Sequence, residues 1–145
     1  MQVDINKTVS YEFAKVEVMG VNIGKNADGS MIFMVPYCWL AADGSVIRQN
    51  TGRYSSAELT AALGGGQDAI DMMTKIASLF PEGDRPSLSI RTMLDKVVVY
   101  AGHNETVDGK PKPVVVQYTD ADLTAKGVTE AMIVAVIQQL AVVLV

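Results

Sequence analysis

The sequence predicts a single α+β domain over residues 1–145, with an antiparallel sheet packed against helices. Runs rich in β-branched and aromatic residues are separated by Asp-Gly turns, which is the pattern of β-hairpins. Segments with helical spacing follow in pairs and do not alternate with single strands, which favours α+β over a parallel α/β sheet. A chain of 145 residues buries enough surface to fold without a disulfide or a metal.

The first third of the chain predicts a three-stranded meander. Residues 11–23, 31–41 and 45–54 have the composition of strands, and the tetrapeptide ADGS, which occurs twice, marks the turns between them. The middle strand is apolar at both odd and even positions, so we expect both of its faces to be covered. Pro36 lies inside this strand, and because proline cannot donate to a ladder it favours a bulge or an edge.

Two helices are expected after the meander. Ser55 and Glu58 have the spacing of a capping box for the first helix, which Gly64 ends. Residues 67–80 follow with helical spacing, and Asp68 is expected to cap them. The proline after this segment ends the helix and opens a surface loop over 81–87.

A second hairpin is predicted from residues 92–102 and 112–120, with a long, polar, mobile loop between them. Thr119 and Asp122 have the spacing of a capping box for a short third helix, and Thr129 can cap the last helix. The expected order of elements is therefore β-β-β-α-α-β-β-α-α.

Composition and charge exclude several classes of function. The formal net charge is −4, and Lys and Arg are scattered, so no nucleic-acid partner is expected. Cys38 is the only cysteine and His103 the only histidine, which argues against a cysteine-based zinc site and against His-dependent nucleophilic catalysis. No cofactor or metal motif is present. Residues 1–9 lack the pattern of a signal peptide and are expected to form a flexible N-terminal arm.

The C-terminal segment 131–145 is the most unusual part of the sequence. Thirteen of its fifteen residues are apolar, and it contains no charge. A membrane-spanning helix needs about 20 apolar residues, so no span is expected. Two interpretations stay open: a core helix that ends as a helix or a strand, and a helix that needs a neighbouring subunit to cover it. The second predicts a homo-oligomer interface formed by Ile133, Ile137, Gln138, Gln139, Leu140, Val143 and Leu144.

An aromatic stripe is predicted on one face of the middle strand. Phe33, Val35, Tyr37 and Trp39 alternate along it, and packing in the core or in an interface is their expected role. An alternative function is a small-ligand or peptide-binding module, whose pocket between sheet and helices would be lined by Tyr37, Trp39 and methionines. A third is an enzyme that uses carboxylates assembled from distant parts of the chain.

Residues 34–63 read MVPYCWLAADGSVIRQNTGRYSSAELTAAL: an apolar strand, an Asp-Gly turn, a polar strand and a Ser-capped helix that begins S-x-E-L. This order resembles that of small structural proteins of tailed bacteriophages. The resemblance implies a head, neck, tail or baseplate component that forms a symmetric oligomer and contacts other structural proteins in a virion. The expected function is thus a non-enzymatic structural protein that self-associates; outside a virion, the expected location is the cytoplasm.

Overall fold

The computed structural model describes residues 15–93 and 96–143, with the side chains of residues 93 and 140–143 excepted. These residues form an antiparallel sheet with helices, which confirms the predicted α+β class. The predicted N-terminal arm, 1–9, lies outside the described residues. The strands are β1 (Lys15–Val18), β2 (Gly20–Lys25), β3 (Met31–Leu40), β4 (Val46–Ser55), β5 (Asp84–Met93), β6 (Lys96–Val107) and β7 (Lys110–Tyr118).

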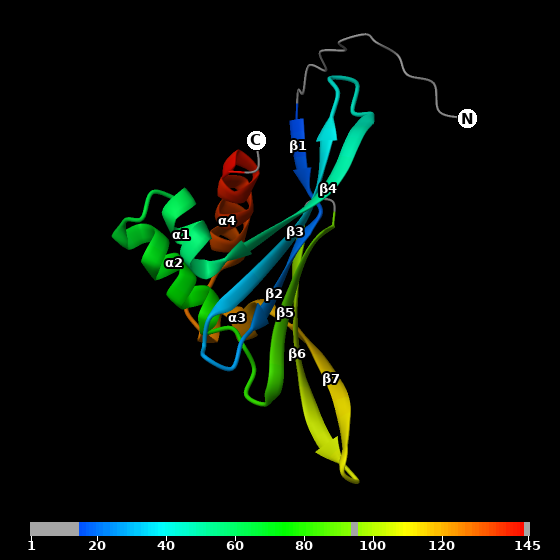
Figure 1. Cartoon of the computed structure of the whole chain (residues 1–145), viewed down its shortest axis with the longest axis vertical. Coiled ribbons are helices and arrows are strands. Elements are labelled where there is room, and N and C mark those ends of the chain that lie inside the picture. Colours follow the sequence, from blue (N-terminus) through cyan, green and yellow to red (C-terminus); the bar gives the residue numbers. More distant parts are fainter. Residues whose placement is uncertain (1–14, 94–95, 144–145) are drawn as a thin grey trace, which may run out of the picture.

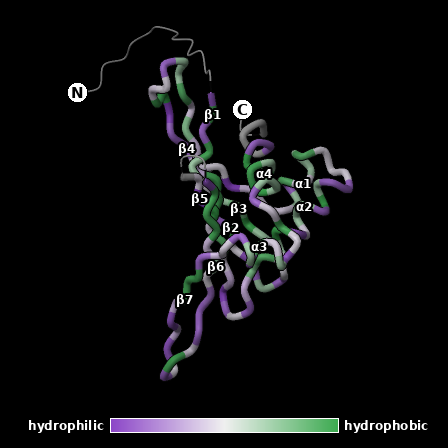
Figure 2. The backbone as a smooth tube through the Cα atoms, turned by 180° about the vertical axis from the view of Figure 1, so that it is seen from behind, coloured by the Kyte–Doolittle hydropathy of each residue, from purple (hydrophilic) through white to green (hydrophobic). Residues whose placement is uncertain are grey.

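Four helices in the described part cover one face of this sheet, as Figure 1 and the reverse view in Figure 2 both show. They are α1 (Ser56–Ala62), α2 (Gln67–Ala77), α3 (Asp120–Ala125) and α4 (Glu130–Val143). The β3–β4 and β6–β7 hairpins extend beyond the helix layer at opposite ends of the molecule (Figure 1). The sheet therefore has one face that carries helices and one that carries none of them.

Strands β1 and β2 occupy one position in the sheet and are separated by an irregularity at Met19. Both pair with β3. From the pair Val18–Tyr37 to the pair Asn22–Met34, the chain moves four residues along β1 and β2 but only three along β3. One extra residue is therefore inserted, which is the definition of a β-bulge. Pro36 lies opposite it, where its carbonyl accepts from the Met19 amide at 2.9 Å. The expected preference of Pro36 for a bulge is confirmed.

The bulge keeps the apolar residues on the face that the helices cover. Val18 is buried before it, and Val21 and Ile23 are buried after it, so the buried positions change from even to odd. Side chains alternate along a strand, so this change of parity requires an extra residue. Gly20 completes the arrangement, because an added Cβ would lie 2.7 Å from the carbonyl oxygen of Ile90 on β5.

The two ADGS tetrapeptides form the same turn. Asp28 accepts from the amide and the hydroxyl of Ser30 at 2.9 and 2.6 Å. Asp43 accepts from the amide and the hydroxyl of Ser45 at the same two distances. The glycine between each pair has positive φ, as this hairpin turn requires. The predicted meander of β2, β3 and β4 is confirmed by these turns and by the antiparallel pairing.

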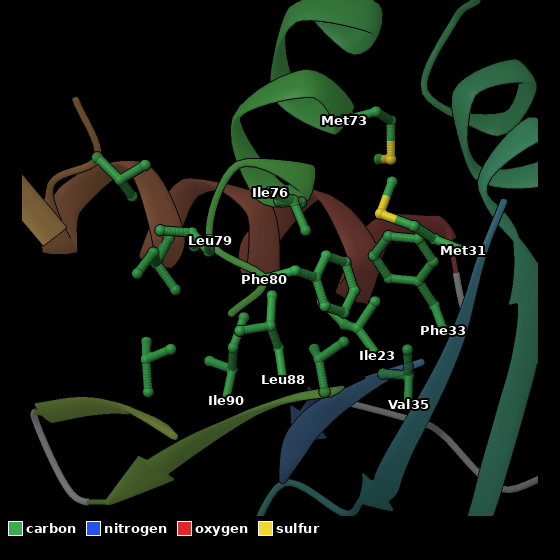
Figure 3. Packing of buried hydrophobic residues seen from close by; sticks show 14 of the residues in the cluster. Ile23, Met31, Phe33, Val35, Met73, Ile76, Leu79, Phe80, Leu88 and Ile90 are labelled. Atoms are coloured by element: carbon green, nitrogen blue, oxygen red, sulfur yellow. The ribbon is translucent and has the colours of Figure 1, made fainter. Parts of the chain in front are cut away.

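The core lies between the sheet and the helix layer (Figure 3). Phe33 of β3 and Phe80, which follows α2, come close together at its centre, and the side chains of Met31 and Met73 point toward each other. Leu88 and Ile90 of β5 continue the same apolar floor. The residues of the core therefore come from strands and helices that are far apart in sequence.

Several boundaries differ from those predicted. The predicted strand 11–23 is divided by the bulge, and residues 84–87 of the loop predicted at 81–87 belong to β5. The single strand predicted over 92–102 contains the end of β5 and the start of β6. The long mobile loop predicted between 102 and 112 does not exist, because β6 and β7 continue to a turn at Asp108-Gly109. Ladder hydrogen bonds extend the polar strands further than their composition suggests.

Two further expectations are wrong. Asp68 does not cap α2: Gly66 is the N-cap, without a side-chain hydrogen bond, and Asp68 lies in the first turn. The middle strand β3 is covered by helices on one face only, and on the other face Met34 is 44% exposed. Ser55, Thr119 and Thr129 do occupy the predicted capping positions, and Thr119 forms a complete capping box with Asp122.

We predict that Gly20→Ala destabilises the protein, because the new methyl group would press against the β5 backbone. The expected loss is about 1–3 kcal/mol of unfolding free energy, measured by urea denaturation. Gly24→Ala is the matched control, since Gly24 lies in the same strand with no atom within 4 Å of the added Cβ. Equal effects of the two substitutions would contradict the role assigned to Gly20.

The hydrogen bonds from the Thr119 amide and hydroxyl lower the pKa of Asp122 below its usual 3.8. A carboxyl group with a lowered folded-state pKa stabilises the protein above its unfolded pKa, and this contribution is lost as the pH falls through the folded pKa. We therefore expect Asp122→Asn to lower Tm at pH 7, and the difference from the wild type to shrink in the acid range below pH 3.8. Asp120→Asn removes a charge from the same turn without these hydrogen bonds and should have a smaller effect.

Candidate functional site

Helix α4 is held against the sheet near its first turn. Thr129 precedes the helix and its hydroxyl accepts from the Met132 amide at 3.3 Å. Glu130 accepts from the Val97 amide of β6 at 3.2 Å, which ties the helix to the sheet. Ile133 is 5% exposed and belongs to the core. The chain therefore orients α4 with one stripe directed inward.

The rest of α4 is apolar but incompletely covered. Between Glu130 and Gln138 every residue is apolar, yet only Ile133 is fully buried. Val134, Val136 and Ile137 are half-buried. Ala131, Met132 and Ala135 are exposed, with Met132 at 37%. A helix that is apolar on nearly all sides is normally covered on nearly all sides, so the exposed part of α4 is a candidate contact surface.

The structure separates the residues of the predicted interface. Ile133 faces the core, Ile137 is half-buried, and Gln138 and Gln139 are exposed. At 100° per residue, Gln138 and Gln139 both fall within the arc of about 120° that also holds Ala131, Met132 and Ala135, so both glutamines lie on the exposed side of the helix. The predicted positions Leu140 and Val143 belong to α4, but their side chains are outside the described part of the structure, as is the whole of Leu144.

A cleft of about 280 Å³ lies between α2 and α4, with the sheet as its floor. Val21, Ile23, Phe33 and Ile90 form this floor, and all are apolar. The α4 wall contributes Met132, Ala135, Val136 and Ile137, so the exposed stripe of α4 borders the cleft directly. The side chains that line the inner part of the cleft are therefore all apolar.

The polar groups of the cleft come from α2. Asp68, Asp71 and Lys75 line it and are exposed, beside the half-buried Met72. Spacings of three and four residues put these side chains on one stripe of the helix. Asp71 accepts from Gln67 at 2.8 Å, whereas Lys75 forms no ion pair with any residue in the described part of the chain. The rim of the cleft is thus acidic toward the start of α2 and basic toward its end.

Two hydrogen bonds hold the segment after α2 in place. The Tyr118 hydroxyl of β7 donates to the Leu79 carbonyl at 2.7 Å, and the ammonium of Lys126 donates to the Ser78 carbonyl at 3.2 Å. Burial is the main cause that raises the pKa of Tyr118, so this phenol stays a donor at neutral pH. Leu79 lines the cleft, and these bonds therefore stabilise its wall.

The aromatic stripe lies elsewhere. Phe33 and Tyr37 are buried on the helix-covered face, and Trp39 is half-buried, with its ring 6.3 Å from that of Tyr37. Arg48 lies 5.7 Å from the Trp39 ring, and Asn50 donates to the Tyr37 hydroxyl at 3.3 Å. The cleft is lined by Phe33 and by methionines of α2 and α4, so the expected lining by Tyr37 and Trp39 is wrong.

The sheet face without helices also exposes apolar side chains. Met19, Met34 and Val115 are 50%, 44% and 66% exposed. Cys38 is buried on this face, with its thiol 3.4 Å from the sulfur of Met19. The burial of Cys38 agrees with its place in the apolar run of residues 31–42. Met34 lies on β3 and Val115 on β7, with β2, β5 and β6 between them, so these exposed side chains do not form one continuous apolar patch.

The titratable groups of the described residues are spread over strands, helices and turns. His103 belongs to β6 and approaches Glu105 at 3.3 Å. Within residues 15–93 and 96–143, no three His, Cys, Asp or Glu side chains lie close enough together to hold a metal ion. No helix within the same ranges is long and apolar enough to cross a membrane.

A comparison with protein-family models gives no match for this chain, and a comparison with curated proteins gives none either.

We predict that Ile133 and Gln139 of α4 differ sharply in their contribution to stability. Ile133→Ala removes a buried side chain and should lower the unfolding free energy by about 2–5 kcal/mol. Gln139→Ala changes an exposed residue and should change it by less than about 0.5 kcal/mol. Urea denaturation at low protein concentration measures both. A large loss for Gln139→Ala under those conditions would show that this part of α4 is core.

Proposed function

We propose that this protein is a non-enzymatic structural protein that self-associates through the surface formed by α4 and the cleft beside it. The observation that carries the proposal is the apolar side of α4 that its own chain leaves exposed, at Ala131, Met132 and Ala135. Removing this surface from water favours association, by roughly 25 cal/mol for each Å² of apolar area. A second copy presents the same apolar surface, so the proposed assembly is a homo-oligomer.

The shape of the sheet supports an assembly role. The β3–β4 and β6–β7 hairpins project from opposite ends of the molecule, and β4 and β7 leave the two sheet edges unpaired in the described structure (Figure 1). Unpaired edges present rows of amides and carbonyls that another chain can use. Pro111 and Pro113 block part of the β7 edge, because they have no amide to donate.

The resemblance of residues 34–63 to tailed-bacteriophage structural proteins gives the proposal its biological setting. This stretch forms most of β3, the Asp-Gly turn, β4 and α1, in which the Glu58 amide donates to the Ser55 side chain. The proposed role is a head, neck, tail or baseplate component within a virion, in contact with other structural proteins. Copies would be related by closed symmetry, as is usual in homo-oligomers.

A second candidate function is favoured by the cleft alone. An apolar cavity of about 280 Å³ is close to the lower limit of small-molecule sites, which start at roughly 300 Å³. Its chemistry suits a small apolar ligand with a cationic or donor group toward Asp68 and Asp71. A protein that stays monomeric and binds such a ligand would favour this function over assembly.

We predict that Ala135→Glu weakens self-association by about tenfold or more, because it places a charge in the apolar contact. The absolute mass from light scattering coupled to size exclusion, at tens of micromolar protein, measures the effect. Ala61→Glu is the matched control, since Ala61 is an exposed alanine on α1, away from the cleft. The wild type and Ala61→Glu should form the same defined oligomer. A monomeric wild-type protein would contradict the proposed function.

A further inference from the structure

We infer that the cleft face is a two-fold interface, in which α2 lies antiparallel on α2 of a second copy and the two clefts face each other. This inference rests on the proposed self-association and specifies its geometry. It commits to one occupant, a second copy of this chain. Two observations lead to it: the order of charges along the rim of the cleft, and the apolar stripe that forms the opposite wall.

The charges on α2 are complementary to themselves when the helix is reversed. Asp68 and Asp71 come first, and Lys75 follows on the same stripe. In an antiparallel pair centred between residues 71 and 75, the Lys75 ammonium of each copy lies opposite the Asp71 carboxylate of the other. In a parallel pair, like charges would lie opposite each other, which is unfavourable. The charge order therefore selects the two-fold arrangement.

Lys75 is available for such a contact. Asp71 precedes it by four residues, a spacing at which oppositely charged side chains on a helix can meet. No ion pair forms between them in the described structure, and Asp71 accepts instead from Gln67 at 2.8 Å. The ammonium of Lys75 stays on the rim of the cleft, where it can reach a carboxylate of a second copy.

The α4 wall provides the apolar part of the contact. Under the same two-fold rotation, Met132 and Ala135 lie against their equivalents in the second copy and close the mouth of both clefts. Met132 is flexible and 37% exposed, so its side chain can turn into the adjoining cavity. The result is an apolar centre flanked by two symmetric Asp71–Lys75 pairs, the usual arrangement of a core and a polar rim.

The test exchanges the two charges. Lys75→Asp makes the rim entirely acidic, and Asp71→Lys makes its second half basic, so each variant alone should dimerise about tenfold more weakly than the wild type. An equal mixture of the two variants should regain dimers, because two acidic side chains at positions 71 and 75 of one chain then face two basic side chains at the same positions of the other. The double variant D71K/K75D should also regain dimers. Sedimentation velocity measures the dimer dissociation constant, and circular dichroism checks the fold of each variant.

Lys110→Asp is the control, since it reverses a charge on β7 far from the cleft and should leave the dissociation constant unchanged. A wild-type oligomer that both single reversals leave intact would overturn this interface while the proposed self-association stands. A wild-type monomer would overturn both. Nile red, a neutral apolar dye, gives the remaining outcome: stoichiometric binding to a monomer would identify the cleft as a ligand site and overturn the interface.

Discussion

The extra residue at Met19 is the constraint on which the helix layer depends. Side chains alternate along a strand, and the buried positions change parity between Val18 and Val21. Without the bulge, Val21 and Ile23 would point to the face that carries no helices. Both residues belong to the floor beneath α2 and α4, so the core and the cleft would lose their base together. Gly20 allows β5 to pack closely beside the bulge, because any residue with a Cβ at this position would clash with the Ile90 carbonyl oxygen of β5.

As a consequence, the two faces of the sheet differ in how much of their surface is covered by helices. The helices cover one face of the sheet, and α4 lies in that layer with one of its own sides exposed (Figures 1 and 2). The opposite face exposes Met19, Met34 and Val115. Exposed apolar surface beside a well-buried core can mark a site of contact with another molecule. The proposed function follows from this distribution and from the chemistry of α4.

Carboxylates have two different roles in this molecule. Asp28, Asp43 and Asp122 accept hydrogen bonds from nearby hydroxyls and amides, which lower their pKa values and fix turns or a helix end. Asp68 and Asp71 lie on the stripe of α2 that borders the cleft. Asp68 had the sequence pattern of a cap, but Gly66 takes that position. The two roles therefore cannot be separated by residue type and local spacing, because a carboxylate near a helix start suits both.

Local sequence determined the α+β class, the two identical ADGS turns, the caps at Ser55, Thr119 and Thr129, and the burial of Cys38. Each depends on residues a few positions apart, so its physical cause lies within a short segment. The apolar C-terminal segment left two interpretations open, a core helix and a helix that needs a neighbouring subunit to cover it, and in the structure part of α4 is exposed. Its inward stripe at Ile133, however, depends on the angle at which α4 meets the sheet.

The tertiary structure decided the features that join distant segments. The strand β5 and the long β6–β7 ladder form because polar residues gain hydrogen bonds from a neighbouring strand, and composition does not record that gain. The cleft unites residues 21–33 of the sheet, 68–79 and 128–137, which only the packing of α2 and α4 brings together. Its α2 stripe of Asp68, Asp71 and Lys75 was missed, although three- and four-residue spacing could have indicated it. Sequence predicts which side chains share a helix face, and tertiary packing decides what that face meets.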